Sequence, residues 1–364
     1  MVDLNDLEEI KKLDPKDVLG STEMFVAQCR QIHEIVENTE LPEFNFSMIT
    51  GETPRDMHLS CVIFSGMGGS AYGGHVAISL FRDELPIPAV VSSDYGLPAF
   101  ANCDSIVIPT SYSGSTEETL SAFDQAKSEN AEIIVLTSGG KLAEYAKADG
   151  RDDKVSSIAL FDPKHNPSGQ PRLGTGYIVL GTIEILRKIG LLRLSLEDIE
   201  NAIDEVEKNI SNIKSTAMDL SQQIYGNIPL IFAGSIFEGN AHILRNQFNE
   251  TAKSFSSFHY IPEANHHVLE GLKNPEGRKL VALFLDSDLY GSKIQKRIEL
   301  TKDVAKQNNT DVVSYKAQGL TKLSQSLELL AFGSYLTFYT AILYGQDPSV
   351  IPWVDYFKEK LAEK

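Results

Sequence analysis

The chain has 364 residues, of which 42% are hydrophobic, so it is long enough to form two domains of ordinary size. Its 50 acidic residues outweigh 33 Lys and Arg residues and give a formal charge of -17, which argues against nucleic acid and anionic membranes as partners. An anionic ligand would therefore need a local positive potential from a few cations, backbone N–H groups and helix N-termini.

Residues 1–50 are predicted to form a helical N-terminal extension, because apolar side chains recur at helical spacing between residues 24 and 36. Residues 51–194 alternate short apolar runs, Gly- or Ser-rich turns and helical stretches, which is typical of a mainly parallel sheet with crossover helices. The sequence predicts the strands of this first α/β domain at residues 61–64, 88–91, 105–108, 133–137 and 155–160.

Residues 195–223 are predicted to form a bridging helix, which opens with Ser195 and Asp198 in a capping-box pattern and is apolar along one face. The strands of a second α/β domain, which spans residues 224–364, are predicted at residues 230–233, 255–261, 280–285 and 311–315. Two similar stretches, FSGMGGSAYGG from Phe64 and FAGSIFEGNAH from Phe232, begin the two domains. We therefore expect a distant internal duplication.

The apolar segment at residues 329–344 contains Ser, Thr and Tyr and falls short of the roughly 20 apolar residues that a membrane span needs. It is predicted to be a buried helix and a contributor to a subunit interface. Cys29, Cys61 and Cys103 are far apart and form no CxxC pair, which predicts neither a disulfide framework nor a structural zinc site. The N-terminus has no basic segment followed by an apolar run, so we expect a cytoplasmic protein without a secretory signal.

Two turns carry the strongest chemical signals, and each lies between a predicted strand and a predicted helix. In SYSGSTEET, residues 111–119, hydroxyl groups surround a glycine at a helix N-terminus, where they and unpaired backbone N–H groups can bind a phosphate. An ordinary Ser/Thr-rich helix cap is the alternative. The glycine-rich turn GMGGS, residues 66–70, does not match the dinucleotide-binding pattern GxGxxG, so a nicotinamide cofactor is disfavoured.

Together, GMGGS and SYSGST resemble the sugar isomerase (SIS) domain, whose Ser/Thr loop binds the substrate phosphate. The later segments NQFNETAKS, YIPEANHH, LAFGSYLTFYTAILYGQDPS and DYFKEKL follow the order found in the bifunctional phosphoglucose/phosphomannose isomerase family. The resemblance runs from about residue 60 to the end of the chain. It implies two SIS-type doubly wound domains, each a mainly parallel sheet flanked by helices.

The resemblance also implies site residues. Glu250 matches the family's catalytic base, His266 the histidine assigned to ring opening, and Arg172 the arginine near the reacting carbons. Lys358 matches a carboxy-terminal active-site lysine, although Lys360 lies close by. The side chains expected to bind the phosphate and neighbouring hydroxyls are those of Ser70, Ser111, Ser113 and Thr116.

The family reaction interconverts glucose 6-phosphate, and here also mannose 6-phosphate, with fructose 6-phosphate through a cis-enediol. It needs a carboxylate base, a group that moves a proton at the ring oxygen and a cation beside the developing oxyanion, and the resemblance implies neither a metal nor another cofactor. The family likeness further implies a homodimer in which the histidine of one subunit completes the site of the other. Two alternatives remain: a non-catalytic sugar-phosphate sensor, and an aminosugar-phosphate isomerase or deaminase.

Each assignment has an ordinary structural alternative. Glu250 alone would be a solvated or salt-bridged side chain, Arg172 a surface arginine, and Lys358 one more charge on an exposed terminal helix. His267 is expected to be a hydrogen-bonded structural histidine. The sequence also departs from the family, with His75 where an Asp is common and His267-Val268 where Asn-Glu is common.

Overall fold

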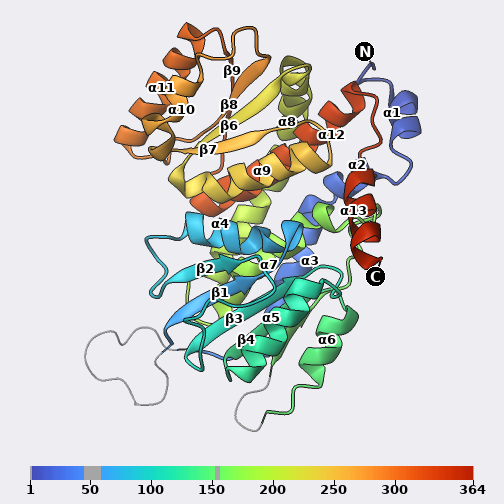
Figure 1. Cartoon of the computed structure of the whole chain (residues 1–364), viewed down its shortest axis with the longest axis vertical. Helices are drawn as coiled ribbons and strands as arrows, with labels where there is room; N and C mark the ends of the chain where they lie inside the picture. Colours follow the sequence, from blue (N-terminus) through green and yellow to red (C-terminus); the bar gives the residue numbers. More distant parts are fainter. Residues whose placement is uncertain (1, 45–58, 152–155, 364) are drawn as a thin grey trace.

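The computed structural model describes residues 2–44, 59–151 and 156–363, and it contains two parallel sheets, each flanked by helices (Figure 1). The first sheet has the order β2-β1-β3-β4-β5, and the second has the order β7-β6-β8-β9. The strands are β1 (Cys61–Ser65), β2 (Ala89–Ser92), β3 (Ser105–Ser111), β4 (Glu132–Thr137), β5 (Ser157–Leu160), β6 (Ile228–Gly234), β7 (Ser257–Ile261), β8 (Leu280–Asp286) and β9 (Asp311–Lys316).

The predicted strands are confirmed with small shifts at their ends, while residue 155, the predicted start of the fifth, lies outside the described residues. β1 and β3 are buried at every residue, because helices cover the sheet. Strands buried on both faces read as continuous apolar runs, which is why the sequence locates them well.

The helices of the first half are the short 3-10 turns η2 (Gly68–Ala71) and η3 (Pro171–Leu173) with α4 (Tyr72–Leu80), α5 (Glu117–Ser128), α6 (Gly140–Lys147) and α7 (Thr175–Lys188). Those of the second half are η4 (Ser235–Phe237), α9 (Glu238–Glu250), η5 (Glu263–His266), α10 (Val268–Gly271), α11 (Ser292–Gln307), α12 (Lys322–Leu343) and α13 (Pro352–Ala362). In both halves the first strand lies second in the sheet, between the second and third strands of that half, and a 3-10 turn and a helix follow it. This shared order supports the expected internal duplication.

The bridging helix α8 (Leu196–Ile224) begins where the sequence predicts it, with the Ser195 and Asp198 side chains and backbones bonded in a capping box. The two sheets fall within residues 51–194 and 224–364, although the boundaries of those domains remain predictions and the one between residues 50 and 51 lies outside the described residues.

Helix α12 is the central helix of the second half and packs along α8 and α9. Within the described residues it is the one helix long and apolar enough to cross a membrane, yet it lies wholly inside the fold, as the core helix of a soluble protein does. Every residue from Leu323 to Leu343 is buried by the chain itself. The expected buried helix is therefore confirmed, but its expected contribution to a subunit interface is wrong, because no face of it remains free.

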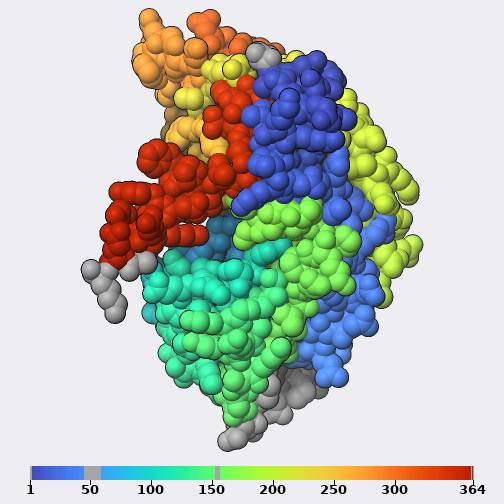
Figure 2. Space-filling model, turned by 90° about the vertical axis from the view of Figure 1, so that its right-hand side faces the viewer, coloured from blue at the N-terminus to red at the C-terminus, as the bar shows by residue number. Residues whose placement is uncertain are grey.

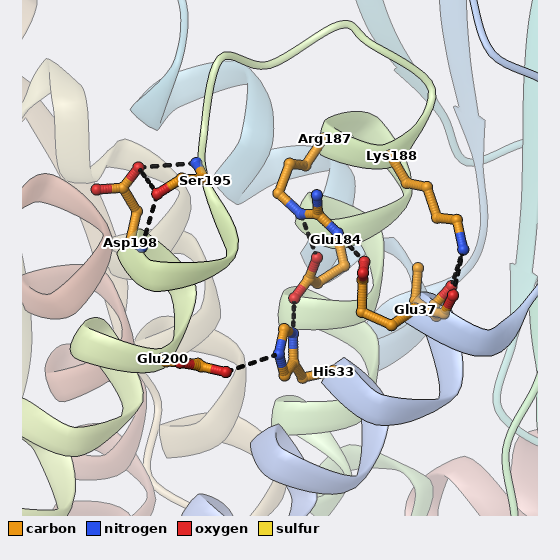
Figure 3. A network of polar contacts seen from close by, with 9 residues as sticks. His33, Glu37, Glu184, Arg187, Lys188, Ser195, Asp198 and Glu200 are labelled. Carbon is orange, nitrogen blue, oxygen red and sulfur yellow. Dashed lines mark hydrogen bonds and ion pairs between the residues drawn. The ribbon is translucent and has the colours of Figure 1, made fainter.

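The N-terminal extension is helical, with α1 (Leu7–Leu13), α2 (Val18–Glu23) and α3 (Phe25–Asn38). Polar contacts fasten α3 to α7 (Figure 3). The fully buried carboxylate of Glu184 bonds to His33 and, at 2.7 Å, to Arg187. The ammonium group of Lys188 donates to the backbone carbonyl groups of Val36 (2.9 Å) and Glu37 (2.5 Å).

Candidate active site

The two turns singled out in the sequence lie side by side. They follow the carboxyl ends of β1 and β3, which pair in parallel with Ser65 opposite Pro109. The backbone N–H of Tyr112 donates to the Ser70 hydroxyl at 3.1 Å and so joins the two turns. Ligands of open α/β sheets bind at this edge, because loops from neighbouring strands converge there.

The Ser/Thr loop is shaped by its own hydroxyl groups. The N–H of Gly114 donates to the Ser111 hydroxyl at 3.0 Å, and the hydroxyls of Ser111 and Thr116 are 2.9 Å apart. Thr116 is the N-cap of α5, but its side chain accepts no helix N–H. The Thr116 side chain therefore does not cap the helix, as the alternative interpretation of the loop would require. The N–H groups of the first helical turn remain available to an anion. Ser113 is exposed beside them.

Arg172 lies in η3 against the glycine-rich turn, where a Cβ on Gly69 would sit 3.4 Å from the Arg172 Cα. It is a buried residue, with 5% of its surface exposed, so it is not the surface arginine of the alternative interpretation. Its Nη2 donates to the carbonyls of Pro348 and Ser349, both at 2.8 Å, and its Nη1 donates to Gln170. Burial lowers the pKa of this guanidinium, against the opposing effect of nearby acids such as Glu250.

Glu250 is the last residue of α9, and the burial of its carboxyl group raises its pKa above the ordinary value. Arg172, Lys358 and Lys253 oppose this shift, because their positive charges favour the carboxylate. Within the described part of the chain no hydrogen bond holds this carboxyl group, so it is a partly buried acid with cations near it and not a fully solvated surface charge. A carboxyl group whose pKa is raised toward neutrality is suited to taking and returning a proton.

The structure distinguishes the two candidate lysines of α13. Lys358 acts on the charge of Glu250, whereas Lys360 is bonded to Glu363 at 2.7 Å and lies over the ring of Tyr356. Figure 2 shows the red C-terminal segment reaching over a hollow whose lower wall is the teal part of the first half. The candidate site lies where these segments meet.

Two further residues belong to the site but were not singled out in the sequence. Tyr72, the first residue of α4, is fully buried, and burial together with Glu250 raises its pKa. Lys253 follows Glu250 in the quoted segment NQFNETAKS, and its charge acts on Glu250. The signal that could have found both is proximity in the sequence, since Tyr72 lies two residues after the glycine-rich turn and Lys253 three residues after Glu250.

His266 is not among the charged groups that act on Glu250. It is exposed at the end of η5, and α10, which follows it, lies in Figure 1 on the side of the molecule away from α13. Its neighbour His267 bonds to Glu263 at 2.9 Å, as expected of a structural histidine. Within the described ranges no cluster of three His, Cys, Asp or Glu side chains is arranged to hold a metal ion.

The parallel sheets, the hydroxyl-lined loop at a helix N-terminus and the partly buried acid among cations define a phosphosugar-binding protein of the SIS type. Similar folds occur in a protein of Thermus thermophilus (TM-score 0.68, 15% identity, 98% of this chain and 94% of that one). Tagatose-6-phosphate ketose/aldose isomerase from Escherichia coli is also similar (TM-score 0.63, 15% identity, 94% and 95%).

Residues 213–361 match the family model of the bacterial phospho-glucose isomerase C-terminal SIS domain. The chain is 34% identical to the bifunctional phosphoglucose/phosphomannose isomerase of Caldicellulosiruptor bescii, over 83% of this chain and 89% of the relative. It is 30% identical to the enzyme of the same name from Aquifex aeolicus, over 83% and 90%. The chain belongs to the bifunctional phosphoglucose/phosphomannose isomerase family. A D-glucosamine-6-phosphate 4-epimerase from Sulfolobus acidocaldarius is 28% identical, over 68% and 75%.

Proposed function

We propose that this chain interconverts glucose 6-phosphate and mannose 6-phosphate with fructose 6-phosphate. The observation that carries the proposal is Glu250, a partly buried carboxyl group with a raised pKa, set among cations from both halves of the chain. Membership of the family supports the choice of substrates. A sensor would need the hydroxyl loop but would have no use for a poised base.

The substrate phosphate binds at the loop between β3 and α5. Hydroxyl groups of Ser111, Ser113 and Thr116 and the free N–H groups at the α5 N-terminus supply donors. Hydrogen bonds from these donors act at short range, whereas salt screens the more distant charges of the chain. The loop can therefore bind an anion although the whole chain carries a charge of -17.

Glu250 is the base that transfers the proton between C2 and C1. Its carboxylate takes the proton from C2 of the open-chain aldose, so that the C1 carbonyl oxygen becomes the oxyanion of an enediolate, and the proton of the C2 hydroxyl then passes to this C1 oxygen. The same group returns the proton to C1 as the C2 oxygen becomes the ketose carbonyl. Arg172 and Lys358 provide positive charge beside the enediolate. Because both aldoses give the same enediol, one base can serve both C2 epimers if the site lets the bond between C2 and C3 rotate.

Ring opening is assigned to His266 of a second copy of this chain, in a homodimer with shared sites. Two observations support this arrangement. His266 is exposed, and α10, which follows it, lies in Figure 1 on the side of the molecule away from α13. Beside the site, α13 exposes Trp353 (82%), Phe357 (62%) and Leu361 (63%), and such apolar groups on a soluble protein mark an interaction surface.

Turnover of each sugar phosphate to fructose 6-phosphate, with a chelator present, is the direct test. We expect both to be converted by the unaltered chain and neither by the Glu250→Gln variant. Glucosamine 6-phosphate is the comparison substrate, because one relative acts on that sugar by name. Binding of the hexose phosphates without turnover would make the chain a sensor and overturn the proposal.

A further inference from the structure

The C-terminal helix α13 is held to the body of the protein by very little of its own surface. All of its described side chains are exposed. The chain enters it through a compact turn at residues 347–349, in which the Asp347 carboxylate accepts from the N–H and the hydroxyl of Ser349, both at 2.7 Å. Pro348 and Ser349 are buried, so this turn is the anchor of the helix.

Two cations from different halves of the chain hold the carbonyl groups of this anchor. Arg172 donates to Pro348 and Ser349, both at 2.8 Å. Lys253 donates to the carbonyl of Asp347 at 2.5 Å and to that of Thr251 at 3.1 Å. Hydrogen bonds from charged donors are about twice as strong as neutral ones, so together these contacts fix the direction in which α13 leaves the body.

Lys253 sits in a constrained position of its own. Its backbone is left-handed, with φ of 51°, a conformation that non-glycine residues adopt only where the surroundings impose it. Burial and the neighbouring Arg172 lower the pKa of its ammonium group to about 8, while Asp347 and Glu250 oppose the shift.

We propose that Lys253 is a positioning residue, which through the turn at 347–349 seats α13 so that Lys358 faces Glu250. The catalytic part of this inference rests on the proposed function, but the placement of α13 does not. Nothing in Lys253 itself needs to touch the substrate. Its effect reaches the reaction through the helix that carries Lys358.

The charge on Lys253 makes the anchor sensitive to alkaline pH. Below about pH 8 the ammonium group is charged and holds the Asp347 carbonyl strongly. As the pH rises through that value it becomes a neutral amine, and the hydrogen bond loses its charge assistance. The helix should then loosen and turnover should fall. The charged groups that face Lys253 are Arg172, Asp347 and Glu250.

Trp353 provides a direct probe, because it is the single tryptophan of the chain and lies at the start of α13. In the unaltered protein we expect its fluorescence anisotropy to fall with a midpoint near the Lys253 pKa of about 8. Lys253→Arg should keep the anisotropy high at alkaline pH, since a guanidinium stays charged. Lys253→Met should show low anisotropy throughout, and its kcat should fall by about tenfold or more with a smaller change in KM.

Lys188→Met is the matched control. Lys188 also donates to two backbone carbonyls and has a pKa lowered by burial, but it lies on α7 in the contact with α3 (Figure 3). This variant should lose stability without changing the Trp353 signal or its pH midpoint.

The outcomes separate the two proposals. A Trp353 transition near pH 8 that Lys253→Arg removes, in a protein that turns over no sugar phosphate, would support the positioning role and refute the isomerase. An active protein whose Trp353 signal and alkaline profile are the same in Lys253→Arg and the unaltered chain would overturn the positioning role. Both of these tests remain decisive if Lys253→Met fails to fold.

Discussion

Two glutamates, the fully buried Glu184 and the partly buried Glu250, show how the same residue type can stabilise the fold in one place and suit proton transfer in another. Burial raises the pKa of both carboxyl groups. Glu184 is bonded to the fixed partners His33 and Arg187 (Figure 3), whereas among the described residues Glu250 has cations near it and no hydrogen-bonded partner. A group in that state is costly for folding and useful for proton transfer, which is the usual compromise at an active site.

Glu250→Gln should therefore remove activity while leaving stability unchanged or higher. A carboxyl group with a raised pKa in the folded state disfavours folding once it is ionised, so its replacement gains most at neutral pH and nothing in acid. Thermal unfolding at several pH values measures this. The control Glu184→Gln should lose about 2 kcal/mol or more, because it unpairs a buried network. A Glu250→Gln variant less stable than the unaltered chain at pH 7 would contradict the interpretation.

Several of these residues could be predicted from the sequence because their signals are local. Ser111, Ser113 and Thr116 form one turn between a strand and a helix, and Glu250 lies in a recognisable segment. The role of Lys253 could not be read in this way, because its partner carbonyl belongs to Asp347, 94 residues later. Such a contact exists only once α12 has brought its C-terminal end back to the site.

At the scale of elements, the loop between β3 and α5 depends on close contact with the loop after β4. Gly114 has φ of 65°, and a Cβ there would lie 1.7 Å from the carbonyl oxygen of Gly139. No side chain can be accommodated without separating the two loops. The shape of the phosphate site is therefore set by a glycine as much as by the hydroxyl groups.

Gly114→Ala should raise the KM for both sugar phosphates at least tenfold, because the loop and the α5 N-terminus can no longer meet the phosphate together. The matched control is Gly277→Ala, at a glycine with φ of 73° and open space around its Cβ position. That change carries the backbone cost alone, about 1 kcal/mol, and should leave KM unaltered. Equal KM values for the two variants would contradict this role for Gly114.

The elements also show where sequence patterns mislead. Helix α12 was correctly predicted as buried, but its apolar character suggested an interface that the structure excludes. Helix α8 and the strands were located well because capping boxes and continuous apolar runs are local patterns. Which buried helix faces its own chain and which faces a partner is decided only by tertiary packing.

At the scale of the whole molecule, α4 and α9 meet between the two sheets, and His75 stacks on His242 with ring centroids 4.1 Å apart (Figure 1). Burial lowers the pKa of both, that of His242 to about 3, and the charge of Arg245 acts in the same direction. The stacked pair contributes to holding the two halves together only while both rings are neutral.

Acid should therefore weaken this contact. A histidine whose folded pKa is depressed contributes stability above its ordinary pKa of about 6.5, and the contribution is lost as the pH falls toward the folded value. We expect the unfolding midpoint to drop below pH 6 by more in the unaltered chain than in His75→Phe. Differential scanning calorimetry across this range tests it, and parallel curves for the two proteins would show that the stack does not titrate.

The shared-site dimer predicts complementation. Glu250→Gln and His266→Ala should each be inactive alone, but mixed dimers contain one site with both residues intact. An equal mixture that has exchanged subunits should recover up to about a quarter of the unaltered activity. Light scattering verifies that the mixed species are dimers. Mixed dimers without activity, or an active monomer, would refute the shared site.

The common strand order of the two halves means that the loop after β8 occupies the position that the Ser/Thr loop holds after β3. That second loop carries Asp286 and Asp288, which are bonded to Lys302 (2.7 Å) and Lys316 (2.8 Å). Because these lysines are paired with carboxylates, the second loop is less suited than the Ser/Thr loop to binding a phosphate. Under the proposed function the two halves therefore contribute different groups: the first the phosphate loop, the second Glu250 and Lys358. We therefore expect neither half to have isomerase activity when it is expressed alone.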